Sequence, residues 1–450
     1  MARLSAILLA TLVFAGCAAG PTHARQQPLV IRNVSVIPMD TDQVLRSQTV
    51  VVREGRIETV GTDVVAPAGA TVVDGTGRYL IPGLAEMHAH VAGAANNPRI
   101  LTLKAVHGIT TARGMLGAPA HLVLRDSLDR GLVLGPRLIT SGPSFSGPNL
   151  TPEAAAERVR EQHAAGYDLL KIHPGVTRAA FDAMAAAADQ VGIRFSGHVP
   201  LDVGLDRALE ARYHTIDHLD GFMEALLPPG APVAASDGGW FGMNLVPHVD
   251  MNRLPGLVQR VRAAGVAMVP TQTLMEYFAN DMTGDQLAAR EDYRYWIPGQ
   301  VEQWRQQKND RLASSETPPA AQRARYNEIR REMIRALHDG GVPILLGSDA
   351  PQVWNVPGFA THRELHEYVR AGLTPYQALR TGTVNIAEHL GEGGRRGVVR
   401  PGARADLILL DANPLEDITS TLRIHGVVVG GRWIGPEERQ RLLGELRTDG

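Results

Sequence analysis

Cysteine is almost absent from this chain, aromatic residues are scarce, and neither sign of charge dominates. One Cys in 450 residues excludes an internal disulfide framework and any site built from several thiolates. Lys and Arg number 45 against 47 Asp and Glu, and the net charge of -2 gives no electrostatic reason to expect a nucleic-acid partner. Any metal in this protein must therefore be held by carboxylates and by some of its 16 His.

The first residues predict a targeting signal instead of part of the fold. An apolar run over 4–16 is too short to span a bilayer but has the length of a signal-peptide core. Phe14-Ala15-Gly16-Cys17 resembles a bacterial lipobox, with ordinary cleavage after Ala24 as the alternative. A buried N-terminal helix is disfavoured because a polar, Gln-rich stretch follows. We predict that 1–24 is a signal peptide and that the bacterial protein is exported, either to the periplasm or as a lipoprotein anchored to the membrane through Cys17.

Both ends of the remaining chain have the pattern of short strands. Residues 29–80 contain apolar, β-branched runs separated by turn residues, and the same pattern occurs again near the C-terminus. We therefore predict one small β-sandwich domain shared by the two ends, followed by a tail. The expected ranges are 25–80 and 397–435 for the sandwich and 436–450 for the C-terminal tail.

Between these ends, short apolar strands alternate with helical stretches rich in Ala, Leu and Arg. Such alternation is typical of βαβ units and a parallel sheet. Eight strand ends can be counted, the number that a (β/α)8 barrel requires. The predicted fold is thus α/β, a (β/α)8 TIM barrel over 81–396 that carries the split β-sandwich. The eight segments are 83–90, 108–113, 136–142, 167–173, 194–199, 214–219, 267–273 and 342–350.

Two long loops, 219–256 and 274–325, follow the sixth and seventh predicted strands. In a barrel of this kind, the loops after the strands lie on the catalytic face. Four of the five Trp come after strands six to eight, where they either wall a pocket or pack the inserts together. They are Trp240, Trp296, Trp304 and Trp354.

Polar side chains stand at the ends of strands that should be apolar throughout. His88 and His90 are two residues apart, so both point to the same side of a strand. One such His is usually a packed core residue. Six metal-capable side chains on five strand ends favour a metal site instead. Besides the His88 and His90 pair, they are Lys171, His198, His218 and Asp349.

The motifs around these residues resemble those of the metal-dependent amidohydrolase superfamily. Pro82-Gly83-Leu84 followed by His88-Ala89-His90 is similar to its signature PGL(I/V)DxHxH. The segments GITTAR, GPRLITSG, DLLKIH, HTIDHLD and LLGSDA also fit, as does GVVRPGARADLILLDANPLEDI near the C-terminus. The resemblance spans about 29–435 and points to the branch with imidazolonepropionase-like proteins and Xaa-Pro or carboxypeptidase-type dipeptidases.

The resemblance implies a ligand set for two divalent metal ions. His88, His90 and Asp349 would hold the more buried ion, and His198 and His218 the second. Lys171 would bridge both ions as a carbamate formed with CO2, because a free ammonium would repel two cations. The alternative is a salt-bridged Lys171 and a single ion. Zn²⁺ suits such nitrogen and oxygen ligands, and Mn²⁺, Co²⁺ or Fe²⁺ can substitute.

The activity implied is hydrolysis of a C–N amide bond in a small substrate, such as a dipeptide or an N-acyl amino acid. A metal-bridged hydroxide would attack the carbonyl, with Asp349 as the proton shuttle. Two alternatives stay open, namely a one-metal cyclic-amide hydrolase or deaminase, and a binding lipoprotein without catalysis. Intact ligand residues argue against the last.

Two further residues are candidates for substrate binding. His173 lies two residues after Lys171 and should face the same end of the barrel as Lys171. Arg113 ends the second predicted strand, where its guanidinium can bind a substrate carboxylate. A structural ion pair is the alternative for Arg113. We expect a small-molecule amide or peptide as the partner, no nucleic acid, and membrane contact only through a lipid at Cys17, and we leave a homo-oligomer open.

Overall fold

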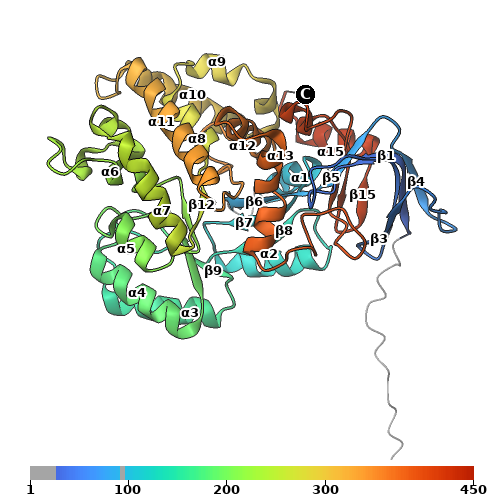
Figure 1. The fold of residues 1–450 in the computed structure, drawn as a ribbon, viewed down its shortest axis with the longest axis horizontal. Coiled ribbons are helices and arrows are strands. Elements are labelled where there is room, and N and C mark those ends of the chain that lie inside the picture. Colours follow the sequence, from blue (N-terminus) through green and yellow to red (C-terminus); the bar gives the residue numbers. More distant parts are fainter. Residues whose placement is uncertain (1–26, 92–96, 450) are drawn as a thin grey trace, which may run out of the picture.

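The computed structural model describes residues 27–91 and 97–449, and it brings strands from both ends of the chain side by side (Figure 1). The predicted signal peptide and Cys17 lie outside the described residues. The fold is α/β, with parallel sheets in the middle of the chain and an additional β domain at one end of the molecule. No helix in the described ranges is both long enough and apolar enough to cross a bilayer.

The end domain is one mixed sheet of eight strands. Its N-terminal and C-terminal parts join where β5 pairs with β13 in antiparallel register, with Leu80 opposite Leu409. β-branched residues such as Val50 and Ile31 face each other across β1 and β2, where they pack well on a pleated surface. The strands are β1 (Leu29–Val36), β2 (Leu45–Arg53), β3 (Arg56–Gly61), β4 (Thr71–Asp74), β5 (Tyr79–Pro82), β13 (Leu407–Leu410), β14 (Ile424–Val429) and β15 (Arg432–Ile434).

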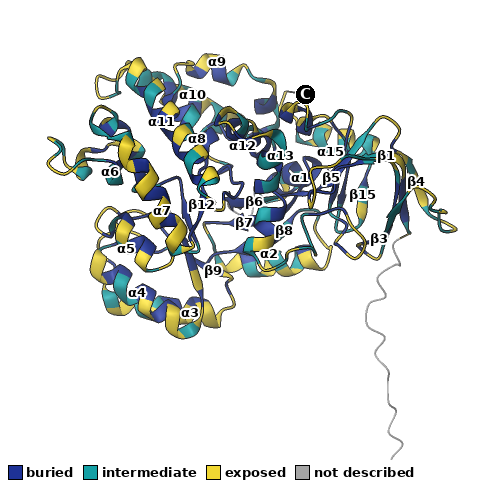
Figure 2. Cartoon of the chain, in the orientation of Figure 1, coloured by how far each residue is buried: buried dark blue, intermediate teal, exposed yellow. Residues whose placement is uncertain are grey.

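Seven short parallel strands form the centre of the molecule. They make one sheet of three strands and one of four, and every pairing within them is parallel. Most of their residues are buried on both faces, as expected where helices cover a parallel sheet (Figure 2). The strands are β6 (Leu84–Ala89), β7 (Ile109–Gly114), β8 (Arg137–Thr140), β9 (Leu169–Ile172), β10 (Arg194–Gly197), β11 (Thr215–Asp217) and β12 (Ala267–Val269).

The predicted eighth strand, 342–350, is irregular. It forms no named strand, and isolated parallel bridges join it to its neighbours, Met268 with Ile344 and Ala89 with Ala350. Its backbone turns at Asp349, whose φ of 62° is incompatible with an extended strand. A further parallel bridge, Ser141 with Leu169, links the two central sheets between β8 and β9.

Helices surround these strands, and the outward faces of the helices are exposed (Figure 2). Local signals explain several of their ends. Helix α3 begins after Thr151, whose side chain accepts a hydrogen bond from Ala154 N, and α4 ends at Gly192 in the left-handed region. The helices that flank β6 to β12 are α1 (Asn97–Val106), α2 (Pro119–Asp129), α3 (Pro152–Ala164), α4 (Arg178–Val191), α5 (Gly204–Glu210), α6 (Phe222–Ala225) and α7 (Leu254–Ala264).

The two long inserts are folded. The first contains α6 and a 3-10 segment at Trp240–His248, and the second contains most of the helices between β12 and the eighth segment. Residues 436–450, which the sequence predicts to be a tail, contain α15. A hydrogen bond of 2.8 Å from Arg439 to Val106 O joins α15 to the end of α1. The later helices are α8 (Gln272–Ala279), α9 (Gly284–Ala288), α10 (Pro298–Ala313), α11 (Ala320–Asp339), α12 (Phe359–Arg370), α13 (Pro375–Thr381), α14 (Val384–His389) and α15 (Pro436–Leu446).

Candidate metal centre

The six predicted ligand side chains meet at the carboxyl ends of the parallel strands. His88 and His90 come from the end of β6, Lys171 from β9, and His198 and His218 from the residues directly after β10 and β11. Asp349 comes from the irregular eighth segment. Successive short contacts, described below, connect all six side chains.

His88, His90 and Asp349 form the tightest group. Asp349 Oδ1 lies 2.7 Å from His90 Nε2 and 3.4 Å from His88 Nε2, and all three ligand atoms lie within 4.8 Å of one another. Two ligands held about 2.0–2.2 Å from one ion in tetrahedral geometry stand roughly 3.4 Å apart, so these separations suit a shared divalent ion.

Lys171 lies beside this group, at the end of a strand that is otherwise apolar. Its Nζ is 3.5 Å from His88 Nε2, and its side chain is fully buried. Burial is the main cause that lowers the pKa of Lys171, although the carboxylates of Asp217 and Asp349 oppose that shift. Gly197 makes room for the lysine, because a Cβ there would lie 2.9 Å from Lys171 Cδ.

His198 and His218 complete the centre on its other side. Their rings stack with centroids 4.3 Å apart, and the His218 ring is 4.6 Å from the His88 ring. His218 Nδ1 lies 3.8 Å from Asp349 Oδ2. His218 and Asp349 both have left-handed backbones, with φ of 64° and 62°, and such strained conformations concentrate at functional sites.

Carboxylate and hydroxyl groups behind the imidazoles orient them. Asp217 Oδ2 lies 2.8 Å from His88 Nδ1, Asp220 Oδ2 lies 2.7 Å from His198 Nδ1, and Thr271 Oγ1 lies 2.8 Å from His218 Nδ1. The hydrogen bonds from His198 and His218 each take Nδ1 and leave Nε2 for a ligand, which is the usual arrangement behind metal-binding histidines. The His88 contact has the same arrangement as an ion pair, without hydrogen-bond geometry. None of these three residues was predicted from the sequence. The signal was present for Asp217 and Asp220, which flank His218 within the motif HTIDHLD.

Arg113 is held behind His88 as well. It is 1% exposed, and its guanidinium donates to Met87 O, Thr215 Oγ1 and Asp217 Oδ1 at 2.6, 2.9 and 3.4 Å. These contacts favour a role in positioning Asp217, the alternative expected from the sequence. The proposed contact between Arg113 and a substrate stays a prediction.

His173 is at the mouth of the centre, where its ring stacks on the His198 ring at 5.3 Å. Burial, followed by the nearby charge of Lys171, lowers the pKa of His173 to about 3, so its imidazole is neutral. Gln352 and Phe241 were not anticipated. Gln352 Nε2 lies 3.0 Å from His90 Nε2, and the Phe241 ring is 5.7 Å from the His218 ring.

The protonation states suit metal binding. Burial is the first cause that holds the pKa of His88 and of His218 well below the usual range, so both rings are neutral donors. Burial opposes charge on Asp349, but its polar neighbours, which include the hydrogen-bonded His90, outweigh burial and lower the pKa of that carboxyl. Among the described residues, His218 Nε2 is a buried atom without a hydrogen-bond partner, which a metal ion would satisfy.

Comparison with known proteins shows the family to which the chain belongs. The amidohydrolase family model matches residues 79–434. Imidazolonepropionase of Idiomarina loihiensis is 25% identical over 421 residues, which cover 86% of this chain and 92% of that protein. Among solved structures, bottromycin amidohydrolase has a TM-score of 0.71 at 25% identity and covers 94% of this chain and 91% of its own.

A protein of Bifidobacterium longum that is provisionally called a prolidase is also similar. It has a TM-score of 0.65 at 25% identity, over 94% of this chain and 99% of its own. The present chain therefore belongs to the amidohydrolase family, in the branch with imidazolonepropionase and prolidase-like proteins, and it is a hydrolase acting on C–N bonds.

Proposed function

We propose that this hydrolase cleaves the amide bond of a small substrate, such as a dipeptide, an N-acyl amino acid or a related amide, at the centre described above. The observation that carries the proposal is the convergence of His88, His90 and Asp349 within 4.8 Å, at the carboxyl ends of parallel strands. We further propose that the bridges at Ser141, Met268 and Ala89 complete a ring of eight parallel segments, the predicted (β/α)8 barrel.

The chain offers ligands for two divalent ions, for which Zn²⁺ is the first candidate. His88, His90 and Asp349 would hold one, and His198 and His218 the other, through the Nε2 atoms that their partners leave free. Bound ions would supply an acidified water and polarise the amide carbonyl.

Lys171 would become the bridge between the two ion positions. Its neutral amine can attack CO2, forming an N–C bond and releasing one proton, and the product is an anionic carbamate with two oxygens. Burial favours the neutral amine, and the 3.5 Å contact with His88 places Nζ beside the ligand group.

Asp349 would move the proton. Its carboxylate accepts the proton of the attacking water and returns it to the leaving nitrogen, acting first as base and then as acid. The contacts with His90 and Gln352, at 2.7 and 3.2 Å, hold that carboxylate in one orientation, and its lowered pKa keeps it ionised before the reaction begins.

We also propose that the protein is exported from a bacterial cell. The support is the apolar run at 4–16 and the lipobox-like residues that end at Cys17. Labelling of the expressed protein with a fatty acid, lost on Cys17→Ala, would separate a lipoprotein from ordinary cleavage after Ala24.

A second candidate is a one-metal cyclic-amide hydrolase, favoured by the similarity to imidazolonepropionase over 86% of the chain. Metal analysis of the purified protein separates the two. We expect two equivalents per chain in the wild type, about one in Lys171→Ala, and partial recovery of both metal and amide hydrolysis when a short carboxylic acid is added. One equivalent in both proteins would leave the one-metal alternative.

A further inference from the structure

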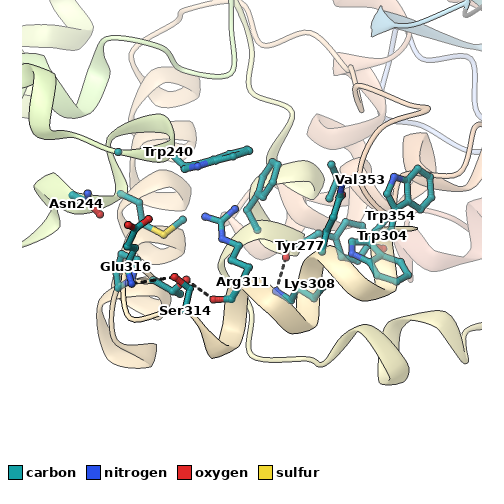
Figure 3. Close-up of a pocket in the computed structure, with 16 residues that line it drawn as sticks. Trp240, Asn244, Tyr277, Trp304, Lys308, Arg311, Ser314, Glu316, Val353 and Trp354 are labelled. Carbon is teal, nitrogen blue, oxygen red and sulfur yellow. Dashed lines mark hydrogen bonds between the residues drawn. The ribbon is translucent and has the colours of Figure 1, made fainter. Parts of the chain in front are cut away.

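A pocket of about 690 Å³ opens between the inserts that follow β11, β12 and the eighth segment (Figure 3). Its walls are strongly aromatic for a chain with only 5% aromatic residues. The aromatic side chains that line it are Trp240, Tyr277, Phe278, Trp304 and Trp354. Such a wall selects apolar or aromatic groups of a ligand.

Two chains of contact link the pocket wall to the metal centre, although none of the six candidate ligands lines the pocket. In the first, the Phe241 ring lies 5.7 Å from the His218 ring and 6.2 Å from the ring of Phe278 in the pocket wall. In the second, Val353 of the pocket directly follows Gln352, whose amide nitrogen is 3.0 Å from His90 Nε2. These contacts place the pocket next to the centre, on the side from which an elongated substrate would reach it.

Arg311 is the cation that the pocket presents to a ligand. Its guanidinium carbon lies 4.8 Å from the centre of the Trp240 ring and 5.0 Å from that of Phe278 (Figure 3). These rings pack against the guanidinium and leave N–H groups for a planar acceptor such as a carboxylate. Within the part of the chain that the structure describes, no carboxylate pairs with Arg311.

Lys308, the other basic residue of the pocket, is already satisfied. It is 5% exposed, and its ammonium donates to Tyr277 O at 2.8 Å and to Asn280 O at 2.7 Å. Trp354 Nε1 is a buried donor without a partner among the described residues, so the ligand contact is assigned to Arg311 alone. The pocket thus combines an apolar wall with an unpaired cation that suits an anionic acceptor.

We propose that this pocket binds the far end of an elongated amide substrate, with Arg311 holding a carboxylate and the aromatic wall holding apolar side chains next to it. The proposal rests on the proposed function and adds a substrate class to it. Phe241 and Phe278 lie in successive contact between His218 and Arg311, so the carboxylate is some distance from the scissile bond. An extended peptide advances about 3.3–3.6 Å per residue. A substrate with about two to four residues after the scissile bond would therefore reach from the metal centre to Arg311.

The test is a series of acyl peptides built from Phe and Leu, with one to four residues after the scissile bond. Each is made as the free acid and as the terminal carboxamide. For the metal-loaded wild type, we expect kcat/KM to favour the acid by about 10- to 100-fold at two to four residues, as expected for hydrogen bonds to a charged group. Arg311→Gln should lower kcat/KM for the acids to the level of the amides, chiefly through KM.

Arg305→Gln is the matched control. Arg305 lies on the same helix, α10, but pairs with Glu302 and Asp285 outside the pocket, and its loss changes the net charge equally. This variant should keep the preference for acids. Equal rates for acids and amides at every length in the wild type, or an unchanged preference in Arg311→Gln, would overturn the proposal while leaving the hydrolase function intact.

A binding measurement tests the pocket proposal independently of catalysis. If the wild type cleaves no peptide in the series, the amide-hydrolase proposal fails for peptides, and the same acids are titrated into the full-length wild type and Arg311→Gln. Tryptophan fluorescence reports binding, because Trp240 is 58% exposed at the pocket. Tighter binding by the wild type supports the assignment, and equal binding overturns it.

Discussion

Asp217 Oδ2 lies 2.8 Å from Nδ1 of His88, and Nε2 of the same ring lies 3.4 Å from Asp349. The imidazole is thus held between a carboxylate that orients it and the group that would share its metal. Asp217 is itself fixed by a hydrogen bond of 2.7 Å from Thr215 and by Arg113 at 3.4 Å. We therefore expect Asp217 to influence the affinity of His88 for a metal ion.

We expect Asp217→Asn to weaken metal binding by about 10- to 100-fold, because the amide orients His88 less strongly and lowers its basicity. Competition with a chromogenic chelator measures the affinity. Thermal unfolding of the metal-free protein provides the control, since the loss of charge beside buried Arg113 also destabilises the fold. An unchanged affinity would show that Asp217 serves only the stability of the interior around the parallel strands.

Asp349→Asn should reduce kcat by about 10²- to 10⁴-fold, the usual contribution of a positioned acid and base. Because Asp349 is also a proposed ligand, the metal content of the variant is measured alongside its rate. Asp126→Asn is the control, since Asp126 is exposed and pairs only with Arg130 on the surface. Substantial turnover in metal-loaded Asp349→Asn would contradict the proton shuttle.

The convergence of the six candidate ligands could be predicted because each lies at the end of an apolar strand. A His, Lys or Asp at such a position needs a physical reason, and period 2 already placed His88 and His90 on one side. The alternation of strands and helices likewise predicted the parallel sheets. These features depend on local sequence, which one chain displays directly.

Other features depend on contacts between distant residues. The position of Arg113 follows from its pairing with Asp217, 104 residues away, and no local pattern reports that contact. The eighth segment is apolar enough to be a strand, but a left-handed Asp349 interrupts its pairing. The pocket around Arg311 is formed by residues of three inserts. The Trp positions in the sequence therefore indicated an aromatic pocket lining, but they did not indicate that Arg311 lies among these rings.

Gly197 gives a test of the space around Lys171. Its φ is 126°, and an added Cβ would lie 2.4 Å from Ile172 O and 2.9 Å from Lys171 Cδ. We expect Gly197→Ala to displace the lysine and to lower the metal content and the rate of hydrolysis together. Elemental analysis and kcat measure both effects.

Gly192→Ala is the matched control for that change. Gly192 ends α4 with a φ of 75°, and a Cβ there would meet nothing within 4 Å. Both variants should lose about 1 kcal/mol or more of stability from backbone strain. Only Gly197→Ala should lose metal. Normal metal content in Gly197→Ala would mean that Lys171 does not depend on the space that Gly197 provides.

The lowered pKa of buried Lys308 should make the stability of the protein depend on pH. Burial lowers its pKa from 10.5 to about 8, whereas in the unfolded chain the amine returns to its ordinary value. Between these values the unfolded state binds more protons than the folded state, so stability rises with pH. The penalty from the charged form is complete below about pH 8 and is relieved as pH approaches 10.5. A neutral amine still has two N–H groups for Tyr277 O and Asn280 O.

The measurement compares the wild type with Lys308→Met, which lacks the titrating group. In metal-free protein, the unfolding free energy of the wild type minus that of the variant should increase between about pH 8 and pH 10, by at most about 1.4 kcal/mol per pH unit. Gln307→Met, the neighbouring change on α10, should give a difference that is flat with pH. A flat difference for Lys308→Met as well would mean that the buried amine keeps its ordinary pKa, stabilised by the two carbonyls as an ammonium.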